Sequence, residues 1–452
     1  MAQTLKIGAL KFGAQKSKFI AGLLAIAISG CSAEPCDPSI PADPALSAFY
    51  DRLYALESGA GVEKLRILHL GDSHIAGDRF SGSLQSRFAV RFGDAGRGQL
   101  PAGSPFPYYR RQGISVEMTG GWTIFSSLSG AAVGPFGLSG YRAEAASDNE
   151  WMSFSVDQGV PLQDVTLNLL QQPGGGSLSL LVDGEERVSF QTNGAFSRLM
   201  QVSADVSLAR RVVLRPVGDG PVAVLGWGGE GDGPGVVYEA HGVPGATARV
   251  MDAWDERIVG PELDEMQPDL ILLGYGTNEG FDDALNTDLY RVRLENQVRQ
   301  LKTRVPGATI LMLGAFDGAR LPAWAELRPS QQAASRAALP CEPLALNERA
   351  TYADLNEDRD PVLGRWHAPP NLRAVRAVHR DVARSEGFAY WDGAAAMGGA
   401  CAIHAYVFQE PPLAYGDHVH LTPAGADHLA ANLWDRLITP YEALVCRRRL
   451  AG

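Results

Sequence analysis

The stretch "ILHLGDSHIAGD", residues 67–78, contains an apolar run followed at once by glycine, aspartate, serine and histidine. With the three residues before it, the apolar run predicts a fully buried strand over residues 64–70. A side chain that follows a strand of a parallel sheet lies at the sheet edge where open α/β folds place their sites. Ser73 is therefore either a nucleophile at that edge or only the N-cap of the next helix.

Three more apolar runs have the same character and alternate with segments of helical pattern. We expect these strands at residues 269–276, 308–316 and 387–392. The accompanying helices are expected at residues 48–60, 288–305 and 372–386. Strands that alternate with helices of this length predict a parallel sheet covered by helices on both faces. The expected fold class is α/β, a three-layer sandwich with a central parallel sheet.

Residues 115–238 have a different pattern, with short β-type runs separated by glycine-rich turns. Asp183-Gly184 is a typical hairpin dipeptide. We therefore expect an inserted all-β domain, a small sandwich or jelly roll, inside an α/β domain formed by residues 48–114 and 239–442. The proline- and charge-rich segment 318–368 is expected to form a functional loop region or partial helices.

Composition narrows the classes of partner. The 452 residues are 45% hydrophobic and 20% charged, which is typical of a globular chain. The net charge of −11, with no basic stripe beyond the first twenty residues, argues against a nucleic-acid partner. No cluster of His, Cys, Asp and Glu has the spacing of metal ligands, so we expect no metal and no cofactor. We expect a monomer.

The N-terminus carries targeting information. Residues 1–31 have the pattern of an export signal, with four lysines before a short apolar run. Its last four residues, Ile28-Ser29-Gly30-Cys31, resemble a bacterial lipobox, which implies lipidation of Cys31 and attachment to a membrane through that lipid. The alternative is a plain signal peptide cleaved near Ala33. Ser32 resembles the pattern of lipoproteins sent to the outer membrane, so we expect an exported, periplasmic lipoprotein anchored there, with residues 32–47 as a tether.

Export would place the remaining thiols in an oxidising compartment. Cys36, Cys341, Cys401 and Cys446 allow three pairings. We favour Cys36 with Cys446, because the two ends of a domain often lie close together, and Cys341 with Cys401. The alternative is that the thiols are free and buried.

A nucleophilic serine needs a base, and candidates for this role occur near the C-terminus. Asp417 and His420 stand three residues apart, just before a helix expected to begin near Pro423. In a turn, this spacing lets the carboxylate fix the imidazole tautomer while the other ring nitrogen faces the serine. His418 is the weaker candidate, because it points the opposite way if the segment is extended.

The reaction also needs hydrogen-bond donors for a developing oxyanion. Gly276-Thr277-Asn278 ends a buried strand and places an amide at the same sheet edge as Ser73. Gly245, which has no side chain, would let its backbone N–H approach the same point. In isolation each is more simply a capping asparagine or a turn glycine, but segments that converge on one sheet edge are harder to dismiss.

Four other polar residues are better explained by structural roles. Asp392 follows a predicted strand and is expected to cap the next turn. Asp78 is expected to be a capping or supporting acid near the site rather than a catalytic one. His241 and His367 are expected to be structural or pocket-lining histidines.

The four segments together resemble the SGNH or GDSL hydrolases, whose site residues come from four short blocks. Gly71-Asp72-Ser73-His74 is similar to the first block, Gly245 to the second, Gly276-Thr277-Asn278 to the third and Asp417 to His420 to the fourth. The resemblance implies a flavodoxin-like sheet, Ser73 as nucleophile, His420 as base and Asp417 as its orienter. It also implies an oxyanion hole from the N–H groups of Ser73 and Gly245 and the amide of Asn278. His74 and Glu279 replace the leucine and aspartate that many members carry.

Several segments, including "FGDAGRG" and "HGVPGATA", look like the branch that contains bacterial peptidoglycan O-acetylesterases, whose members carry a β-rich, carbohydrate-binding-like insertion. The resemblance implies a serine esterase that removes O-acetyl groups from a cell-envelope glycan, with peptidoglycan as the expected substrate, through an acyl-enzyme. The alternatives are a lipase or thioesterase, an acetylesterase for another polysaccharide, an acetyltransferase, and a non-catalytic glycan-binding lipoprotein.

Overall fold

The computed structural model describes residues 37–157, 161–325 and 339–451. The predicted export signal, the predicted lipidation residue Cys31 and the first part of the predicted tether lie outside these ranges. Within them, no helix is both long and apolar enough to cross a bilayer.

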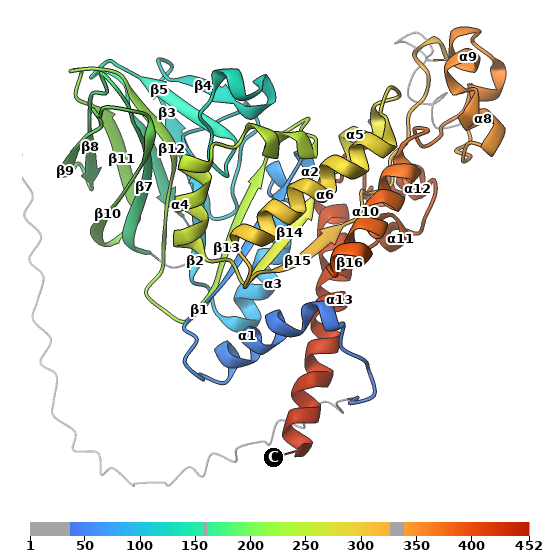
Figure 1. Ribbon diagram of the computed structural model, residues 1–452, viewed down its shortest axis with the longest axis horizontal. Helices are drawn as coiled ribbons and strands as arrows, with labels where there is room; N and C mark the ends of the chain where they lie inside the picture. Colours follow the sequence, from blue (N-terminus) through green and yellow to red (C-terminus); the bar gives the residue numbers. More distant parts are fainter. Residues whose placement is uncertain (1–36, 158–160, 326–338, 452) are drawn as a thin grey trace, which may run out of the picture.

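The centre of the larger domain is a five-stranded parallel sheet (Figure 1). In spatial order its strands are β13 (Gly235–Gly242), β1 (Lys64–Gly71), β14 (Leu270–Gly274), β15 (Thr309–Leu313) and β16 (Ala389–Trp391). Numbered along the chain this order is 2-1-3-4-5, the flavodoxin-like arrangement, in which the chain changes direction between β1 and β14. The expected fold class is confirmed, and the four expected strands are all present.

Successive residues of each strand pack into two different cores. Ile67 lies in the core formed with α1 (Ser47–Glu57), α3 (Phe80–Phe92) and α13 (Pro423–Ala451). Leu68, next in the chain, lies in the core formed with α4 (Glu256–Met266), α6 (Thr287–Arg304) and α10 (Leu372–Glu386). Because both faces are covered, the strands read as continuous apolar runs rather than as alternating ones.

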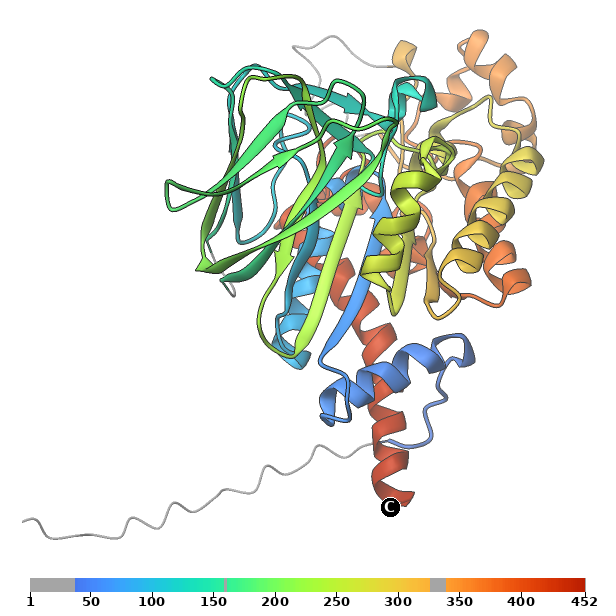
Figure 2. The same cartoon turned by 60° about the vertical axis from the view of Figure 1, so that its left-hand side comes forward.

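The expected β insertion is a sandwich of two antiparallel sheets (Figure 2). The first sheet contains β10 (Arg198–Ala209), β7 (Leu162–Gln171), β12 (Val222–Glu230), β5 (Tyr141–Ala145), β4 (Thr123–Ser126) and, paired to β12, β2 (Gly96–Pro101). The second contains β3 (Ile114–Met118), β6 (Met152–Val156), β11 (Arg211–Pro216), β8 (Ser177–Val182) and β9 (Glu185–Gln191). Trp227 and Phe154 meet edge to face in the core between them, with ring centroids 4.8 Å apart.

At both ends of the insertion, the sheet that a strand joins does not follow the predicted boundaries at residues 115 and 238. β2 lies before residue 115 but pairs with β12 of the sandwich. β13 begins at Gly235 but pairs in parallel with β1 of the central sheet. Both are short β-type segments close to glycine-rich turns, so local sequence pattern does not reveal which sheet each one joins.

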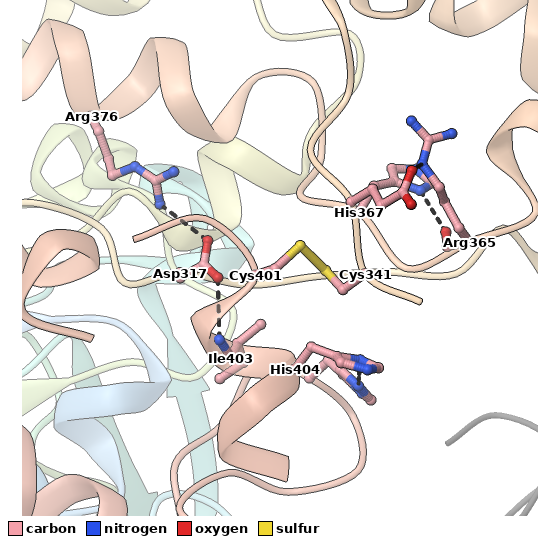
Figure 3. Close-up of a disulfide and its surroundings, with 10 residues drawn as sticks. Asp317, Cys341, Arg365, His367, Arg376, Cys401, Ile403 and His404 are labelled. Carbon is pink, nitrogen blue, oxygen red and sulfur yellow. Dashed lines mark hydrogen bonds and ion pairs between the residues drawn. A yellow bond between two sulfur atoms is a disulfide. The ribbon is translucent and has the colours of Figure 1, made fainter. Parts of the chain in front are cut away.

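The segment 318–368 contains short helices: η5 (Ala323–Ala325), α8 (Leu346–Ala350), α9 (Tyr352–Glu357) and η7 (Pro361–Leu363). A disulfide between Cys341 and Cys401 joins it to the N-terminus of α12 (Ala402–Phe408), as Figure 3 shows. This predicted pairing is confirmed. Cys36 lies outside the described residues, so its pairing with Cys446 stays a prediction.

Candidate active site

Three neighbouring strands of the parallel sheet end at the same level. Gly71 is aligned with Gly242 on one side and with Gly274 on the other. The chain leaves these glycines to form the segments that hold Ser73, Gly245 and Asn278, which lie two, three and four residues further on. The three predicted segments therefore meet at the carboxyl edge of the sheet, around the point where the strand order reverses.

Glycine is required at this edge because of close approach. A Cβ at Gly71 would lie 2.6 Å from the carbonyl oxygen of Gly274, and one at Gly242 would lie 2.0 Å from the backbone nitrogen of Ala76. These distances are far below any normal carbon contact. The glycines let the strand ends and the first turn after β1 pack directly on one another.

The residue that caps this turn is Asp72. It is buried, precedes the short helix α2 (Ser73–Ala76), and accepts a hydrogen bond from the backbone N–H of His74 at 2.9 Å. The alternative that Ser73 is merely the capping residue is therefore wrong. Ser73 occupies the first helical position, and its hydroxyl is left available for another partner.

That partner is His420. The Ser73 hydroxyl Oγ lies 2.9 Å from His420 Nε2, and His420 Nδ1 lies 2.7 Å from Asp417 Oδ2. Asp417 Oδ1 also accepts the backbone N–H groups of Val419 and His420, which fixes the turn between acid and base. The structure thus places serine, imidazole and carboxylate in one hydrogen-bonded chain, with the imidazole 43% exposed to solvent.

The carboxyl group of Asp417 is ionised at any pH near neutrality. Partial burial raises its pKa, but the hydrogen bonds from the His420 side chain and from the two backbone N–H groups outweigh this and lower the pKa to about 2. An ionised acceptor at Nδ1 requires that this nitrogen carry a proton. His420 Nε2 then has a lone pair directed at the Ser73 hydroxyl.

His418 is turned away from this chain of hydrogen bonds. It is buried, adopts a left-handed backbone with φ of 57°, and stacks on Trp366 with ring centroids 3.5 Å apart. Its Nε2 lies 3.1 Å from His404 Nδ1. The orientation agrees with the expectation, although the segment is a tight turn rather than an extended strand.

The loop that contains Gly245 is tied to Asn278. Gly245 has φ of 80°, which favours glycine, and the side-chain amide of Asn278 donates to the carbonyl oxygen of Ala246 at 2.7 Å. An amide nitrogen carries two hydrogens, so one remains for a second acceptor. Asn278 itself lies in α5 (Thr277–Phe281), whose preceding Gly276 has φ of 118°.

Glu279 stabilises the segment that follows the Gly245 loop. Its buried carboxyl group accepts the backbone N–H of Ala248 at 2.7 Å, which fixes the start of the 3-10 helix η4 (Ala248–Ala253). Burial raises the pKa of Glu279 to about 7, although hydrogen bonds from backbone groups oppose the shift. The sequence singled out Glu279 only as a departure from the family and gave no indication of this contact.

The other predicted polar residues have structural partners. Asp392 caps α11 (Gly393–Met397) by accepting the N–H of Ala395 at 3.0 Å. His241 lies 2.7 Å from Glu239, beside a cavity of about 410 Å³ between β13 and the sandwich. His367 contacts the hydroxyl of Tyr352 and the carbonyl of Arg365.

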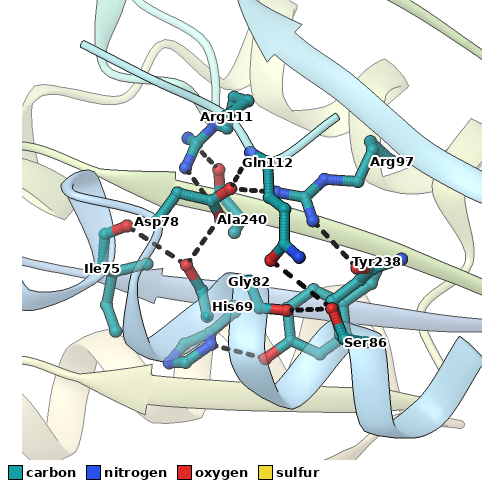
Figure 4. Close-up of polar contacts among 12 residues, drawn as sticks. His69, Ile75, Asp78, Gly82, Ser86, Arg97, Arg111, Gln112, Tyr238 and Ala240 are labelled. Atoms are coloured by element: carbon teal, nitrogen blue, oxygen red, sulfur yellow. Dashed lines mark hydrogen bonds and ion pairs between the residues drawn. The ribbon is translucent and has the colours of Figure 1, made fainter. Parts of the chain in front are cut away.

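Asp78 is the centre of a buried ionic network (Figure 4). Its carboxylate accepts the N–H of Gln112 at 2.7 Å and lies against the guanidinium groups of Arg97 and Arg111. Arg111 also donates to the carbonyl of Ala240 on β13 at 2.6 Å. The network joins the loop after α2 to the chain that enters the insertion, a supporting role that sequence spacing between residues 78 and 111 does not reveal.

Comparison with known proteins indicates a family. Residues 226–428 match the model of the GDSL-like lipase/acylhydrolase family. This part of the chain is therefore similar to the GDSL-like lipases and acylhydrolases. The match includes Gly245, Asn278, Asp417 and His420 but not Ser73, because the insertion separates the first segment from the others. The family match and the fold shared with an O-acetylesterase support a carboxylic ester hydrolase.

One solved structure extends the likeness to most of the chain. A peptidoglycan O-acetylesterase has the same fold, with a TM-score of 0.67, 22% identity, and coverage of 90% of this chain and 98% of that chain. A family two carbohydrate esterase from Cellvibrio japonicus also aligns over 76% of this chain and 98% of its own, with 11% identity and a TM-score of only 0.27. No curated protein matches the chain in sequence.

The buried Glu279 predicts a pH-dependent stability difference. A carboxyl pKa raised from 4.5 to about 7 in the folded state lowers stability progressively as pH rises through that interval. Glu279→Gln removes this charge, so at pH 8 it should increase the free energy of unfolding by up to about 3 kcal/mol, with little effect at pH 4.5. Urea unfolding at both pH values measures the difference.

Exposed Glu265→Gln is the matched control and should show no pH-dependent gain. Equal effects of Glu279→Gln at pH 4.5 and pH 8 would contradict the assigned ionisation.

Proposed function

We propose that the protein is a serine esterase that removes O-acetyl groups from a cell-envelope glycan, with peptidoglycan as the substrate. The observation that carries the proposal is the chain of hydrogen bonds from Ser73 through His420 to Asp417 at the carboxyl edge of the sheet. The choice of substrate is supported by the shared architecture with a peptidoglycan O-acetylesterase, which includes the β sandwich.

In the proposed first step, Ser73 Oγ attacks the acetyl carbonyl carbon and its proton moves to His420 Nε2. Asp417 stabilises the imidazolium that forms. The N–H groups of Ser73 and Gly245 and the amide of Asn278 are the proposed donors to the tetrahedral oxyanion. The intermediate then breaks its bond to the sugar oxygen, which takes the proton from His420 and leaves an acetylated Ser73.

Water completes the cycle. His420 takes a proton from a water molecule, and the resulting hydroxide adds to the acyl carbon. Collapse breaks the bond to Ser73 Oγ, which recovers its proton from His420, and acetate leaves. A sugar hydroxyl in place of this water would make the same residues an acetyltransferase.

A groove beside the oxyanion loop supports a polymeric substrate. It has a volume of about 450 Å³ and lies between the insertion segment around Leu128 and the η4 segment that includes Arg249. Leu128 is half exposed, and its Cδ1 lies 4.0 Å from the position that a Cβ on Gly245 would occupy. The insertion therefore supplies one wall of a groove that lies next to the loop of Gly245.

Arg249 gives this groove a positive group. It is exposed and forms no ion pair within the described part of the chain. A glycan that carries carboxylates close to the acetylated sugar, as the stem peptides of peptidoglycan do, would match it. The groove residues would then act on glycan binding and not on the chemical step.

The proposed location is the periplasmic side of the outer membrane, with Cys31 as the lipidated residue. This proposal rests on the N-terminal sequence pattern, Ile28 to Cys31 followed by Ser32. An anchored enzyme on that side of the membrane would face peptidoglycan directly.

Acetate release tests the proposed function. Wild-type protein should release acetate from O-acetylated peptidoglycan faster than from acetylated xylan, and should cleave p-nitrophenyl acetate in preference to the palmitate. Ser73→Ala should lower kcat by at least about 10⁴-fold, because the nucleophile is lost, whereas the surface variant Ser83→Ala on α3 should retain activity.

The outcomes separate the alternatives. Faster palmitate cleavage would favour a lipase, and faster release from xylan would favour another polysaccharide. Glycan binding without acetate release, or full activity in Ser73→Ala, would contradict the proposal.

The groove makes a separate prediction. Leu128→Ser and Arg249→Gln should each lower kcat/KM for O-acetylated peptidoglycan about 5- to 20-fold, because contacts remote from the ester contribute to binding of the polymer. Both should leave p-nitrophenyl acetate hydrolysis unchanged. Steady-state kinetics on the two substrates measures the contrast.

Leu346→Ser on α8 and Arg187→Gln on β9 are matched surface controls. Equal losses on both substrates, or no loss on the glycan, would exclude the groove as its binding site.

A further inference from the structure

His74 follows the proposed nucleophile directly and is enclosed by groups from two distant parts of the chain. Its side chain is only 6% exposed. Nδ1 lies 3.0 Å from Asp72 Oδ1, and Nε2 lies 3.1 Å from the backbone carbonyl oxygen of Val419. Val419 lies between Asp417 and His420, so one imidazole ring joins the nucleophile segment to the segment that holds the base.

Both ring nitrogens face acceptors. A carbonyl oxygen can only accept, so Nε2 must carry a proton, and Asp72 Oδ1, which already accepts the backbone N–H of His74, calls for a proton on Nδ1 as well. A neutral imidazole has only one N–H and would lose one of the two hydrogen bonds. The geometry therefore requires an imidazolium paired with Asp72.

The surroundings are consistent with this charge state. Phe316 packs edge-on against the ring at 4.9 Å, and the ring of His420 lies 5.6 Å away. The titratable groups that face His74 are Asp72 on its own turn, Asp417 and His420 across the site, and Tyr275, which lines the same small cavity. Burial lowers the pKa of His74, but Asp72, the Val419 carbonyl and Asp417 outweigh it and raise the pKa above its usual value.

We propose that His74, as an imidazolium, is a positioning residue that holds the turn of Asp417 and His420 against the nucleophile helix. The inference rests on the proposed roles of Ser73 and His420. When His74 loses its proton, the contact with Asp72 or with Val419 is lost, and the 2.9 Å approach of His420 to Ser73 is no longer held. Activity should therefore fall at alkaline pH. This alkaline limb of the pH profile should follow the loss of the proton from His74.

The decisive variants differ in which contact they keep. His74→Gln can place an amide N–H near the Val419 carbonyl but loses the contact with Asp72 and does not titrate, so at every pH its activity should stay at the level that wild type reaches at the end of its alkaline limb, and the limb itself should be absent. His74→Leu keeps neither contact and should lower kcat at least 10-fold at pH 7, with KM for p-nitrophenyl acetate little changed.

Asp72→Asn tests the ion pair itself. The second oxygen of Asp72 has no hydrogen-bond partner within the described residues, so an amide fits there without loss of a hydrogen bond. Removal of the negative charge makes the protonated form of His74 less stable, so the alkaline limb of the pH profile should move to lower pH. His69→Asn is the matched control, because His69 is a buried histidine of β1 that contacts Tyr238 at 2.8 Å, and it should leave the limb unmoved.

The experiment is the pH profile of kcat for p-nitrophenyl acetate from pH 5 to 10, corrected for spontaneous hydrolysis, with melting temperatures of each variant. Nitrogen-15 shifts of the imidazole rings provide a second readout, since both nitrogens of His74 should be protonated at pH 7. An unmoved limb in His74→Gln and Asp72→Asn, or a neutral ring at pH 7, would overturn the inference. Failure of the His74 prediction leaves the proposed esterase unaffected, because it concerns only how the base is positioned. Full activity in Ser73→Ala would instead refute the esterase proposal.

Discussion

The hydrogen bond between Ser73 and His420 joins residues that are 347 positions apart in the chain. Neither residue can reach the other unless β1 and the turn before α13 end on the same side of the sheet. The parallel arrangement provides this, because it places the carboxyl ends of β1, β13 and β14 side by side. The strand-end glycines, the Asp72 cap and the Asp417 turn all act to keep that one contact at hydrogen-bonding distance.

The β sandwich lies between the segment of the serine and all the other site segments in sequence, yet it does not separate them in space. It leaves the α/β domain after α3 and returns as β13, directly beside β1. The Asp78 network links the entering chain to the loop after α2 and to β13. An insertion attached at both ends to the site is well placed to shape the approach of a large substrate.

Much of this arrangement could be predicted from the sequence. Buried parallel strands give continuous apolar runs, so β1, β14, β15 and β16 could be predicted, and short polar motifs directly after such runs indicated the segments around Ser73 and Asn278. The spacing of Asp417 and His420 before a predicted helix indicated the base. The strand β13 could not be predicted as part of the central sheet, because an edge strand beside a β insertion has the same local pattern as the insertion. The contacts of Asp78, Glu279 and His74 were also not predictable, since each depends on a partner that only the folded chain brings close.

The central claim is that Ser73 is a nucleophile activated by His420, and covalent labelling tests it most directly. Wild-type protein treated with a fluorophosphonate and mapped by peptide mass spectrometry should be labelled at Ser73 alone. Labelling should be at least 100-fold slower in His420→Ala, because the hydroxyl then has no base to accept its proton. Labelling at another serine, or an equal rate at Ser73 in His420→Ala, would contradict the account.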